Sequence, residues 1–394
     1  MTGIAFVGTG FVADYYKTTL SNHPELKLIG VYDRAPAELQ RFCAFYSVPG
    51  YPSLDAVLDD SRVDIVVNLT NPESHYEISR RALDKGKHVY SEKPLAMHRE
   101  EAEALVRFAA EKDLCLAAAP ANALSPAHTA VAAAIAAGDI GTPRLAYAEL
   151  EDGAVFRDRW KVWRSLSGAR WPGLHEFEIG CTLEHAGYAL SWLTSLLGPV
   201  ETLTAFSSLT FPDKGEGTRH LAMGPDFSVG CLKFASGAVA RLTCGLAAPR
   251  DRSLTILGDA GTILVRDLWD HHSPVYLEKA GAPRSIADKV RGRIERRLAN
   301  VLHLRPRPGR RLALPVETPR AQLPAFPSQI DFSRGVAAQA KAIANGGAPF
   351  FSGDVALHIA ELALALSGAG EQAAPYEVRS TFSPALAAVQ APRR

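Results

Sequence analysis

Three polar side chains near the start of one apolar segment are candidates for proton chemistry. Glu184, His185 and Tyr188 lie in residues 180–198, an amphipathic stretch bounded by glycines that is typical of a buried helix. Burying a carboxylate, an imidazole and a phenol costs free energy unless each is paired or used. Glu184 and Tyr188 are four residues apart, so they would share one helix face. His185, with an ordinary pKa of about 6.5, would be the natural general base if it faces a cleft.

A glycine-rich turn near the N-terminus has the spacing of a dinucleotide-binding loop. It follows an apolar, strand-like run directly, precedes a helix candidate, and reads Gly8-Thr9-Gly10-Phe11-Val12-Ala13. Gly8 would make the tight turn, Gly10 would let the backbone approach a pyrophosphate, and the helix N-terminus would face the anion. Asp33 ends the next strand candidate twenty residues after Ala13, where an acid hydrogen-bonds the ribose hydroxyls of NAD.

Arg34, directly after Asp33, bears on which cofactor is used. An arginine there could stack on adenine or meet the 2′-phosphate of NADP, whereas the Asp33 carboxylate would repel that phosphate. The sequence therefore favours NAD, with NADP as the alternative.

Strand-like and helix-like segments alternate through the first third of the chain. Residues 63–69, 87–92 and 114–119 read as buried parallel strands, and residues 73–85 and 98–112 read as helices. This alternation predicts a doubly wound parallel sheet, which binds ligands beyond the carboxyl ends of its strands. Polar clusters follow two of these strands and are predicted to line that crevice: Thr70, Asn71, Pro72 and His75 after one, and Lys93 after the other.

The motifs GTGFVA, NPESH and above all SEKPLA resemble the glucose–fructose oxidoreductase, inositol dehydrogenase and rhizopine catabolism (Gfo/Idh/MocA) family. The resemblance is specific in the first 125 residues and looser afterwards. It implies a Rossmann domain, an α/β domain built on a large, mostly antiparallel open sheet, and NAD(P)-dependent chemistry on a secondary alcohol of a sugar or cyclitol. It also implies that Lys93 is the catalytic lysine, with Glu92 and Pro94 on the nicotinamide side.

The rest of the chain fits that architecture. Residues 144–152 and 200–211 read as strands, and residues 227–247 and 253–265 read as hairpins. We expect a Rossmann domain over 1–122 and a substrate-binding, oligomerising α/β domain over 123–394, with late helices in 329–368 bracing the first domain. A broad sheet with one uncovered face predicts a homodimer or homotetramer.

The family generally carries an Asp and a His four residues apart where this chain has Glu184 and Tyr188. The departure has precedent in relatives that use a tyrosine. A phenol is a poor base at neutral pH unless a cation stabilises the phenolate. Lys93 could supply that cation, or could itself relay the proton while Tyr188 holds the oxygen. His185 is a third option, and the sequence leaves these alternatives open.

Candidate substrate contacts lie upstream of this helix and at the domain junction. Aromatic faces beside arginines suit a carbohydrate, and residues 158–178 contain Trp163, Arg164 and Trp171. With them we group Lys93, Glu184 and Tyr188 as substrate-binding. Asn122 at the junction could contact nicotinamide or substrate.

Composition and charge argue against several other classes of protein. The net charge of +1 gives no general case for nucleic-acid binding, and five irregularly spaced cysteines fit neither a disulfide framework nor a zinc ribbon. With no apolar run long enough for a membrane span and no signal-peptide pattern, we expect a cytoplasmic protein. His175, Glu176, Cys181 and His185 match no ligand spacing, so no metal is expected. The basic segment 284–311 is interpreted as an insertion packed on the sheet, with a membrane surface or a phosphorylated substrate as the alternative.

The expected function is an NAD(P)-dependent dehydrogenase or reductase acting on a sugar, sugar derivative or cyclitol. Two alternatives remain at this stage. One is a redox-neutral enzyme that retains NAD and uses transient oxidation for epimerisation or glycoside cleavage. The other is a non-catalytic protein that senses dinucleotides.

Overall fold

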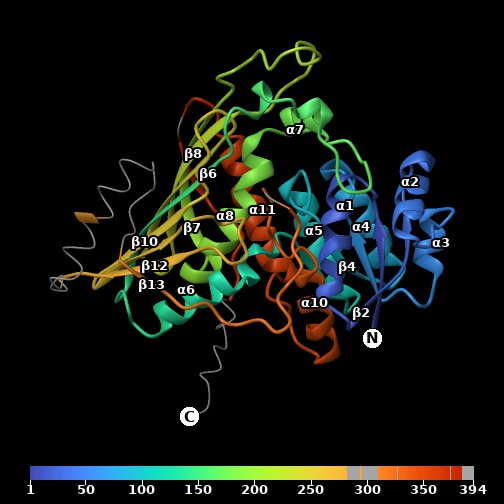
Figure 1. Ribbon diagram of the computed structural model, residues 1–394, viewed down its shortest axis with the longest axis horizontal. Coiled ribbons are helices and arrows are strands. Elements are labelled where there is room, and N and C mark those ends of the chain that lie inside the picture. The colour runs from blue at the N-terminus through green and yellow to red at the C-terminus, as the bar shows by residue number, and fades with distance from the viewer. Residues whose placement is uncertain (282–292, 295–308, 326, 373, 384–394) are drawn as a thin grey trace.

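Two β-sheets side by side form the framework of the protein (Figure 1). The structure, a computed structural model, describes residues 1–281, 293–294, 309–325, 327–372 and 374–383. The first sheet is parallel and the second is mostly antiparallel, which confirms the predicted fold class.

The first sheet has five strands in the order β2-β1-β3-β4-β5. Its strands are β1 Thr2–Val7, β2 Leu26–Tyr32, β3 Ile65–Asn68, β4 His88–Ser91 and β5 Leu116–Ala118. The helices between and after them are α1 Phe11–Thr19, α2 Pro36–Tyr46, α3 Leu54–Asp59, α4 His75–Asp84 and α5 Arg99–Glu111.

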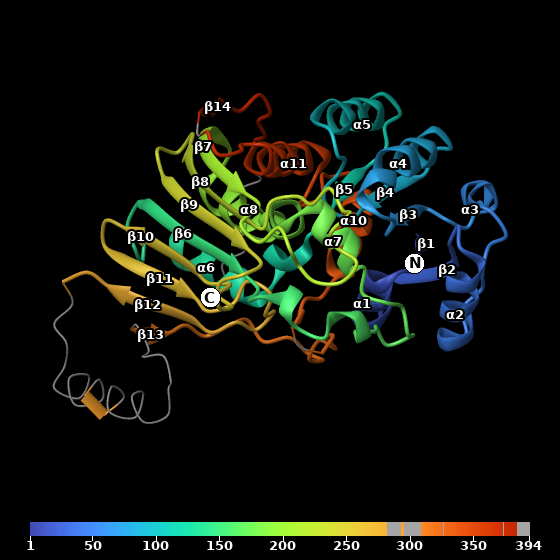
Figure 2. The same cartoon turned by 90° about the horizontal axis from the view of Figure 1, so that it is seen from above.

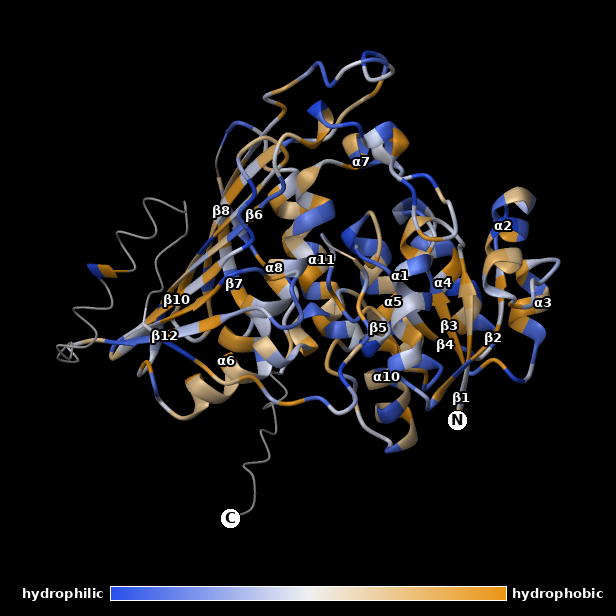
Figure 3. Cartoon of the chain, viewed as in Figure 1, coloured by the Kyte–Doolittle hydropathy of each residue, from blue (hydrophilic) through white to orange (hydrophobic). Residues whose placement is uncertain are grey.

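The hydrophobic runs of this sheet are explained by helices on both of its faces (Figure 2). In β1, Ile4 and Phe6 pack into the core that contains α1, whereas Ala5 and Val7 pack into a second core with α4 and α5. A parallel strand covered on both faces has no solvent side, so it needs no polar alternation. Figure 3 shows the resulting hydrophobic colour of β1, β3 and β4.

The second sheet has nine strands in the order β13-β12-β11-β10-β6-β9-β8-β7-β14. They are β6 Pro143–Glu151, β7 Val200–Ser208, β8 Phe227–Phe234, β9 Val239–Gly245, β10 Leu254–Gly258, β11 Gly261–Val265, β12 Val275–Lys279, β13 Arg310–Arg311 and β14 Pro375–Glu377. Neighbouring strands are antiparallel except β6 and β9, which are parallel. The predicted hairpins form: β8 pairs with β9, and β10 pairs with β11.

One face of the second sheet is covered by long helices. Ala146, Ala148 and Leu150 of β6 are buried in the core, which also holds Trp192 of α8 (Cys181–Leu197). The alternate residues Leu145 and Tyr147 point the other way and stay partly exposed. The remaining helices of this half are α6 Pro126–Ala136, α7 Gly173–Ile179, α10 Arg334–Ala344 and α11 Gly353–Ser367.

The last two helices return to the first sheet. Gln339 of α10 donates to the backbone carbonyls of Val89 and Cys115, and Ser352, just before α11, forms a bridge with Ala117 of β5. These contacts join α10 and the start of α11 to β4 and β5 of the first sheet. Most of the basic segment 284–311, for which packing on the sheet was predicted, lies outside the described residues.

Candidate active site and dinucleotide cleft

The glycine turn has the geometry needed to receive a pyrophosphate. Gly8 has φ +100°, and a Cβ there would lie 2.6 Å from the carbonyl oxygen of Leu69, so only glycine fits. A Cβ on Gly10 would meet nothing within 4 Å, so this position faces open space rather than packing. The N-terminus of α1 follows at Phe11, and its unpaired N–H groups suit an anion. The residues present therefore fit a dinucleotide.

Asp33 stands at the end of β2, as predicted, and stiffens the loops beside the turn. Its carboxylate accepts hydrogen bonds from the backbone N–H and hydroxyl of Thr9, at 2.7 and 3.0 Å, and from the N–H of Ala35 at 2.8 Å. These bonds fix the carboxylate against the glycine turn, where it can meet a ribose.

A cleft of about 860 Å³ lies between the two sheets. Phe11, Val12, Thr70, Asn71, Pro72, His75, Glu92 and Lys93 line it from the first sheet, and Trp163, Arg164, Trp171, Glu184, His185 and Tyr188 line it from the second. Predicted cofactor and substrate residues from distant parts of the chain thus meet at one cleft.

The chain around Lys93 is held so that its side chain enters this cleft. Glu92 donates its backbone N–H to the carbonyl of Asn68 at 2.8 Å and accepts the N–H of Lys93 at 3.0 Å. The Lys93–Pro94 peptide bond is cis, and a ring nitrogen of His75 lies 2.6 Å from the Pro94 carbonyl oxygen. Pro94 is therefore part of the turn that presents Lys93.

Lys93 and Glu184 form an ion pair inside the cleft, with 2.7 Å between Nζ and Oε2. Burial lowers the pKa of Lys93, but the charge of Glu184 outweighs it and raises the pKa. Burial in turn raises the pKa of Glu184, but Lys93 lowers it overall. The pair is therefore ammonium and carboxylate at neutral pH.

Glu176 completes this cluster from α7, hydrogen-bonded to Glu184. Burial and the negative charge of Glu184 raise the pKa of Glu176 well above its ordinary value. One carboxyl of the two therefore keeps a proton while the other is ionised, an arrangement that lets a site both give and take a proton.

Tyr188 lies beside Lys93, with 5.7 Å between Nζ and the ring centroid. Burial and the carboxylates of Glu92 and Glu184 raise the pKa of Tyr188 and outweigh the ammonium of Lys93. The charge of Lys93 is already matched by Glu184, so the phenolate considered from the sequence is not supported. Tyr188 is suited to hold a substrate oxygen as a neutral phenol.

His185 faces the other side of the cleft and is paired. Its Nε2 lies 3.3 Å from Oδ2 of Asp152, and its Nδ1 is buried with no hydrogen-bond partner in the described part of the chain. Asp152 also accepts a 2.7 Å hydrogen bond from Nε of Arg252, whose guanidinium stacks 3.9 Å from the ring centroid of Trp269. Asp152 thus holds one ring nitrogen while the other has no partner among the described residues, so His185 stays an alternative general base beside Lys93.

Asn122, predicted to contact nicotinamide or substrate, is buried and is not among the residues that line this cleft. Its side-chain nitrogen donates to the carbonyls of Tyr188 and Leu268, and its oxygen accepts from the hydroxyl of Ser191. These bonds satisfy the buried amide within the second domain. Asn122 thus fixes the position of α8, and its contact with a cofactor or substrate stays a prediction.

Sequence reasoning missed three contributors to the cleft. Glu176 was weighed only as a metal ligand, because α7 and α8 are separated by Gly180 and no single helical spacing links it to Glu184. Asp152 and Trp269 belong to no motif. Trp269 packs on Tyr188 with ring centroids 4.7 Å apart, and only the sheet topology brings it there.

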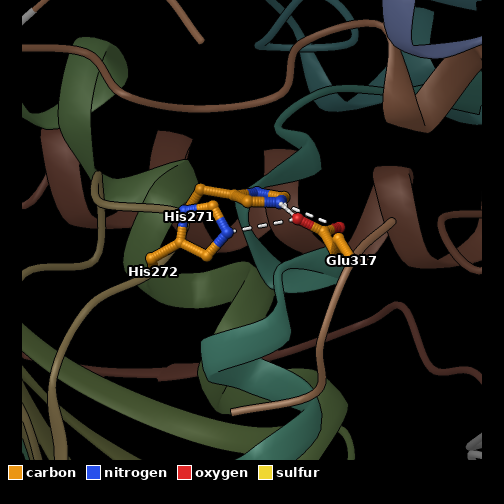
Figure 4. A group of neighbouring side chains, drawn as sticks. All are labelled: His271, His272 and Glu317. Atoms are coloured by element: carbon orange, nitrogen blue, oxygen red, sulfur yellow. Dashed lines mark hydrogen bonds and ion pairs between the residues drawn. The ribbon is translucent and has the colours of Figure 1, made fainter. Parts of the chain in front are cut away.

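One group of possible metal ligands occurs in the described part of the chain: His271, His272 and Glu317 (Figure 4). Nε2 of His271 and of His272 lie 3.1 and 3.2 Å from Oε2 of Glu317. Arg334 forms an ion pair with the other oxygen of Glu317. A hydrogen-bonded network around one carboxylate accounts for these contacts without an ion.

Fold and cleft together define a two-domain, dinucleotide-binding oxidoreductase with an acid–base cluster where the domains meet. The model of the family described as "Oxidoreductase family, NAD-binding Rossmann fold" matches residues 2–119, and the GFO/IDH/MocA C-terminal domain matches residues 128–264. The chain belongs to the Gfo/Idh/MocA oxidoreductase family, and its first domain is an NAD-binding Rossmann domain.

Several relatives show the range of this similarity. UDP-N-acetylglucosamine 3-dehydrogenase of Acidithiobacillus ferrooxidans is 28% identical over 193 residues, which are 45% of this chain and 59% of that protein. Mouse trans-1,2-dihydrobenzene-1,2-diol dehydrogenase is 23% identical over 292 residues, covering 73% and 80% of the two chains. The structure of levoglucosan dehydrogenase with NADH and levoglucosan shares the fold, with a TM-score of 0.74 at 18% identity over 96% of this chain and 100% of that one.

Among helices that the structure describes, none has the length and apolarity required to cross a bilayer.

Proposed function

We propose that the protein moves a hydride between NAD(H) and a secondary hydroxyl or keto carbon of a sugar, sugar derivative or cyclitol. The main support is the cluster of Lys93, Glu184 and Glu176, which lies in the same cleft as the glycine turn. Relatives named as dehydrogenases of UDP-N-acetylglucosamine, glucose 6-phosphate and levoglucosan support the substrate class. NADP remains the alternative cofactor, and the Asp33 carboxylate disfavours it.

Each residue of the cluster would have a separate role in the reaction. Bound nicotinamide supplies the hydride acceptor, while the protein handles the hydroxyl proton. Lys93 and Tyr188 hold the substrate oxygen. As the C–H hydride leaves, the Lys93 ammonium gives a proton to Glu184, 2.7 Å away, and the nitrogen lone pair that this frees takes the hydroxyl proton. Glu176 shares its hydrogen bond with Glu184 and buffers the charge.

The cleft wall suits a carbohydrate ring. Trp163 and Trp171 line the cleft, and Arg164 lines it beside them. Aromatic faces pack on the C–H side of a sugar ring, and polar groups read its hydroxyls.

A substrate panel tests this function. Purified protein with NAD⁺ or NADP⁺ is mixed with neutral sugars, sugar phosphates, nucleotide sugars and cyclitols, and absorbance of reduced nicotinamide is followed. We expect one class to reduce NAD⁺, and Glu184→Gln to slow that reduction while dinucleotide affinity is kept. Failure of the protein to bind either dinucleotide would refute the proposal.

A further inference from the structure

Residues 163–171 form a compact hairpin in the second domain. Arg164 and Arg170 form an antiparallel bridge, and the N–H of Ser165 donates to the carbonyl of Ala169 at 2.9 Å. At its base, the rings of Trp163 and Trp171 pack with centroids 5.1 Å apart. The hairpin is therefore built as a unit rather than as a loose loop.

The tip of this hairpin reaches the first domain and forms hydrogen bonds with Asp14 of α1. The Asp14 carboxylate accepts from the hydroxyl of Ser165 at 2.5 Å, and from the N–H and hydroxyl of Ser167 at 2.9 and 2.8 Å. Tyr46 of α2 donates to the same carboxylate at 2.5 Å. Asp14 is fully buried, so these bonds replace all of its hydration.

Arg41 of α2 connects this contact to the glycine turn. Its Nη2 donates to the carbonyl of Thr9 at 2.7 Å, and its Nη1 donates to the hydroxyl of Ser167. One network thus joins the hairpin tip, two helices and the pyrophosphate-binding turn. Figures 1 and 2 both show the segment before α7 reaching α1 and α2.

The hairpin also forms part of the cleft surface. Arg164, Ser165 and Leu166 line the same cleft as Gly10 and Phe11. Leu166 is 65% exposed, although its neighbours at the hairpin tip are buried or hydrogen-bonded. Trp163, 37% exposed, lines the cleft as well, so the hairpin offers two nearby apolar side chains to a ligand there.

We propose that residues 163–167 are a clasp that contacts the bound dinucleotide and slows its exchange. In this proposal the hairpin passes over a dinucleotide that lies on the glycine turn. The hydrogen bonds between Asp14 and the two serines must then break before the dinucleotide can leave. The proposal rests on the proposed function, because it requires the cleft to bind NAD(H).

Slow exchange has a chemical consequence. A cofactor retained after oxidising one CH–OH group carries the extra hydride, and must return it before the next turnover. The acceptor would be a keto carbon, either in the same molecule or in a second substrate, which gains that hydride and one proton and becomes an alcohol. The clasp thus favours the redox-neutral use of NAD.

The release rate of NADH tests the clasp directly. Protein loaded with NADH is mixed with excess NAD⁺, and the loss of bound-NADH fluorescence is followed by stopped flow. We expect Ser165→Ala/Ser167→Ala to release NADH at least about tenfold faster than the wild type, because both hydroxyl hydrogen bonds to Asp14 are lost. Ser61→Ala, at an exposed turn of the first domain, is the matched control and should leave the rate unchanged.

Leu166→Ala gives a second readout that does not disturb buried groups. Its release rate should rise several-fold, because an apolar contact with the dinucleotide is removed. Equal release rates in the wild type and both variants would overturn the clasp while leaving NAD binding intact. If the wild type itself binds no NADH, the proposed function falls with it, so the two failures are distinguishable.

Discussion

Two carboxyl groups and one ammonium group determine the charge state of the active site. Lys93 and Glu184 neutralise each other at 2.7 Å, and Glu176 holds a proton against Glu184. Glu184 can accept the hydroxyl proton through Lys93, and the ion pair and the hydrogen bond to Glu176 hold these groups in place for that transfer. We therefore assign proton transfer to this cluster, with His185 as the alternative base.

The first residue-scale prediction concerns Lys93. Lys93→Met keeps the length of the side chain but removes the proton carrier, so kcat/KM for alcohol oxidation should fall by about 10²–10⁴. Dinucleotide affinity should change little. Lys85→Met, an exposed lysine of the first domain paired with Asp59, serves as the control, and steady-state kinetics with NAD titration measures both variants. A Lys93→Met enzyme with normal kcat/KM would remove the proposed relay.

The stability of the protein should depend on pH through the carboxyl group of Glu176. Because burial and Glu184 raise its pKa, the folded protein holds a proton there that the unfolded chain loses above about pH 4.3. The free energy of unfolding should therefore fall as pH rises toward the raised pKa. Glu176→Gln carries no titrating proton, so its Tm should decline less as pH rises above about 4.3.

Thermal unfolding across that pH range measures the effect. Glu178→Gln, on the same helix but exposed, should follow the wild type. If all three proteins lose stability equally with pH, the raised pKa of Glu176 is wrong.

Individual residues were predictable from the sequence only where a motif names them. Lys93 follows a strand in a recognisable turn, and Glu184 and Tyr188 share a helix face, so each could be found from the chain alone. Glu176, Asp152 and Trp269 reach the cleft through tertiary packing, which no local pattern in the sequence predicts. The sequence also left the protonation of Tyr188 open, because burial and neighbouring charges decide it.

In the turn between β1 and α1, substitution of one glycine should affect the stability of the fold, and substitution of the other should affect NAD binding. Gly8→Ala places a Cβ 2.6 Å from the Leu69 carbonyl oxygen at φ +100°, so it should destabilise the fold by about 1–3 kcal/mol. Gly10→Ala meets no atom within 4 Å, so it should leave Tm nearly unchanged and weaken NAD binding about tenfold or more.

Denaturant unfolding and NAD titration of both variants check this pair. A Gly10→Ala protein that binds NAD as tightly as the wild type would show that the pyrophosphate does not lie on this turn.

Elements were predictable where the period of the sequence is strong. The parallel strands read as apolar runs because both faces are covered, and the two hairpins show alternation around short turns. The clasp hairpin was read only as a loop rich in tryptophan and arginine. Its shape depends on Asp14 and Arg41, which lie far away in the sequence.

At the scale of the whole molecule, the outer face of the second sheet bears on self-association. Leu145, Tyr147 and Val239 are 39%, 38% and 39% exposed there, and Leu145 is the register partner of Val239. We predict a homodimer or homotetramer joined through this face. Light scattering after size-exclusion chromatography should show it, and Tyr147→Glu/Val239→Glu should shift the protein to monomer. A monomeric wild type would contradict this.

Hydride transfer to bound NAD⁺ is the central claim, and isotope transfer tests it most directly. A substrate found by the panel is prepared with deuterium on its CH–OH carbon and mixed with the NAD⁺-loaded protein, and the dinucleotide is analysed by mass spectrometry. We predict one deuterium in the reduced nicotinamide with the wild type, and far slower labelling with Lys93→Met. Deuterium found in water, with an unlabelled dinucleotide, would contradict hydride transfer in this cleft.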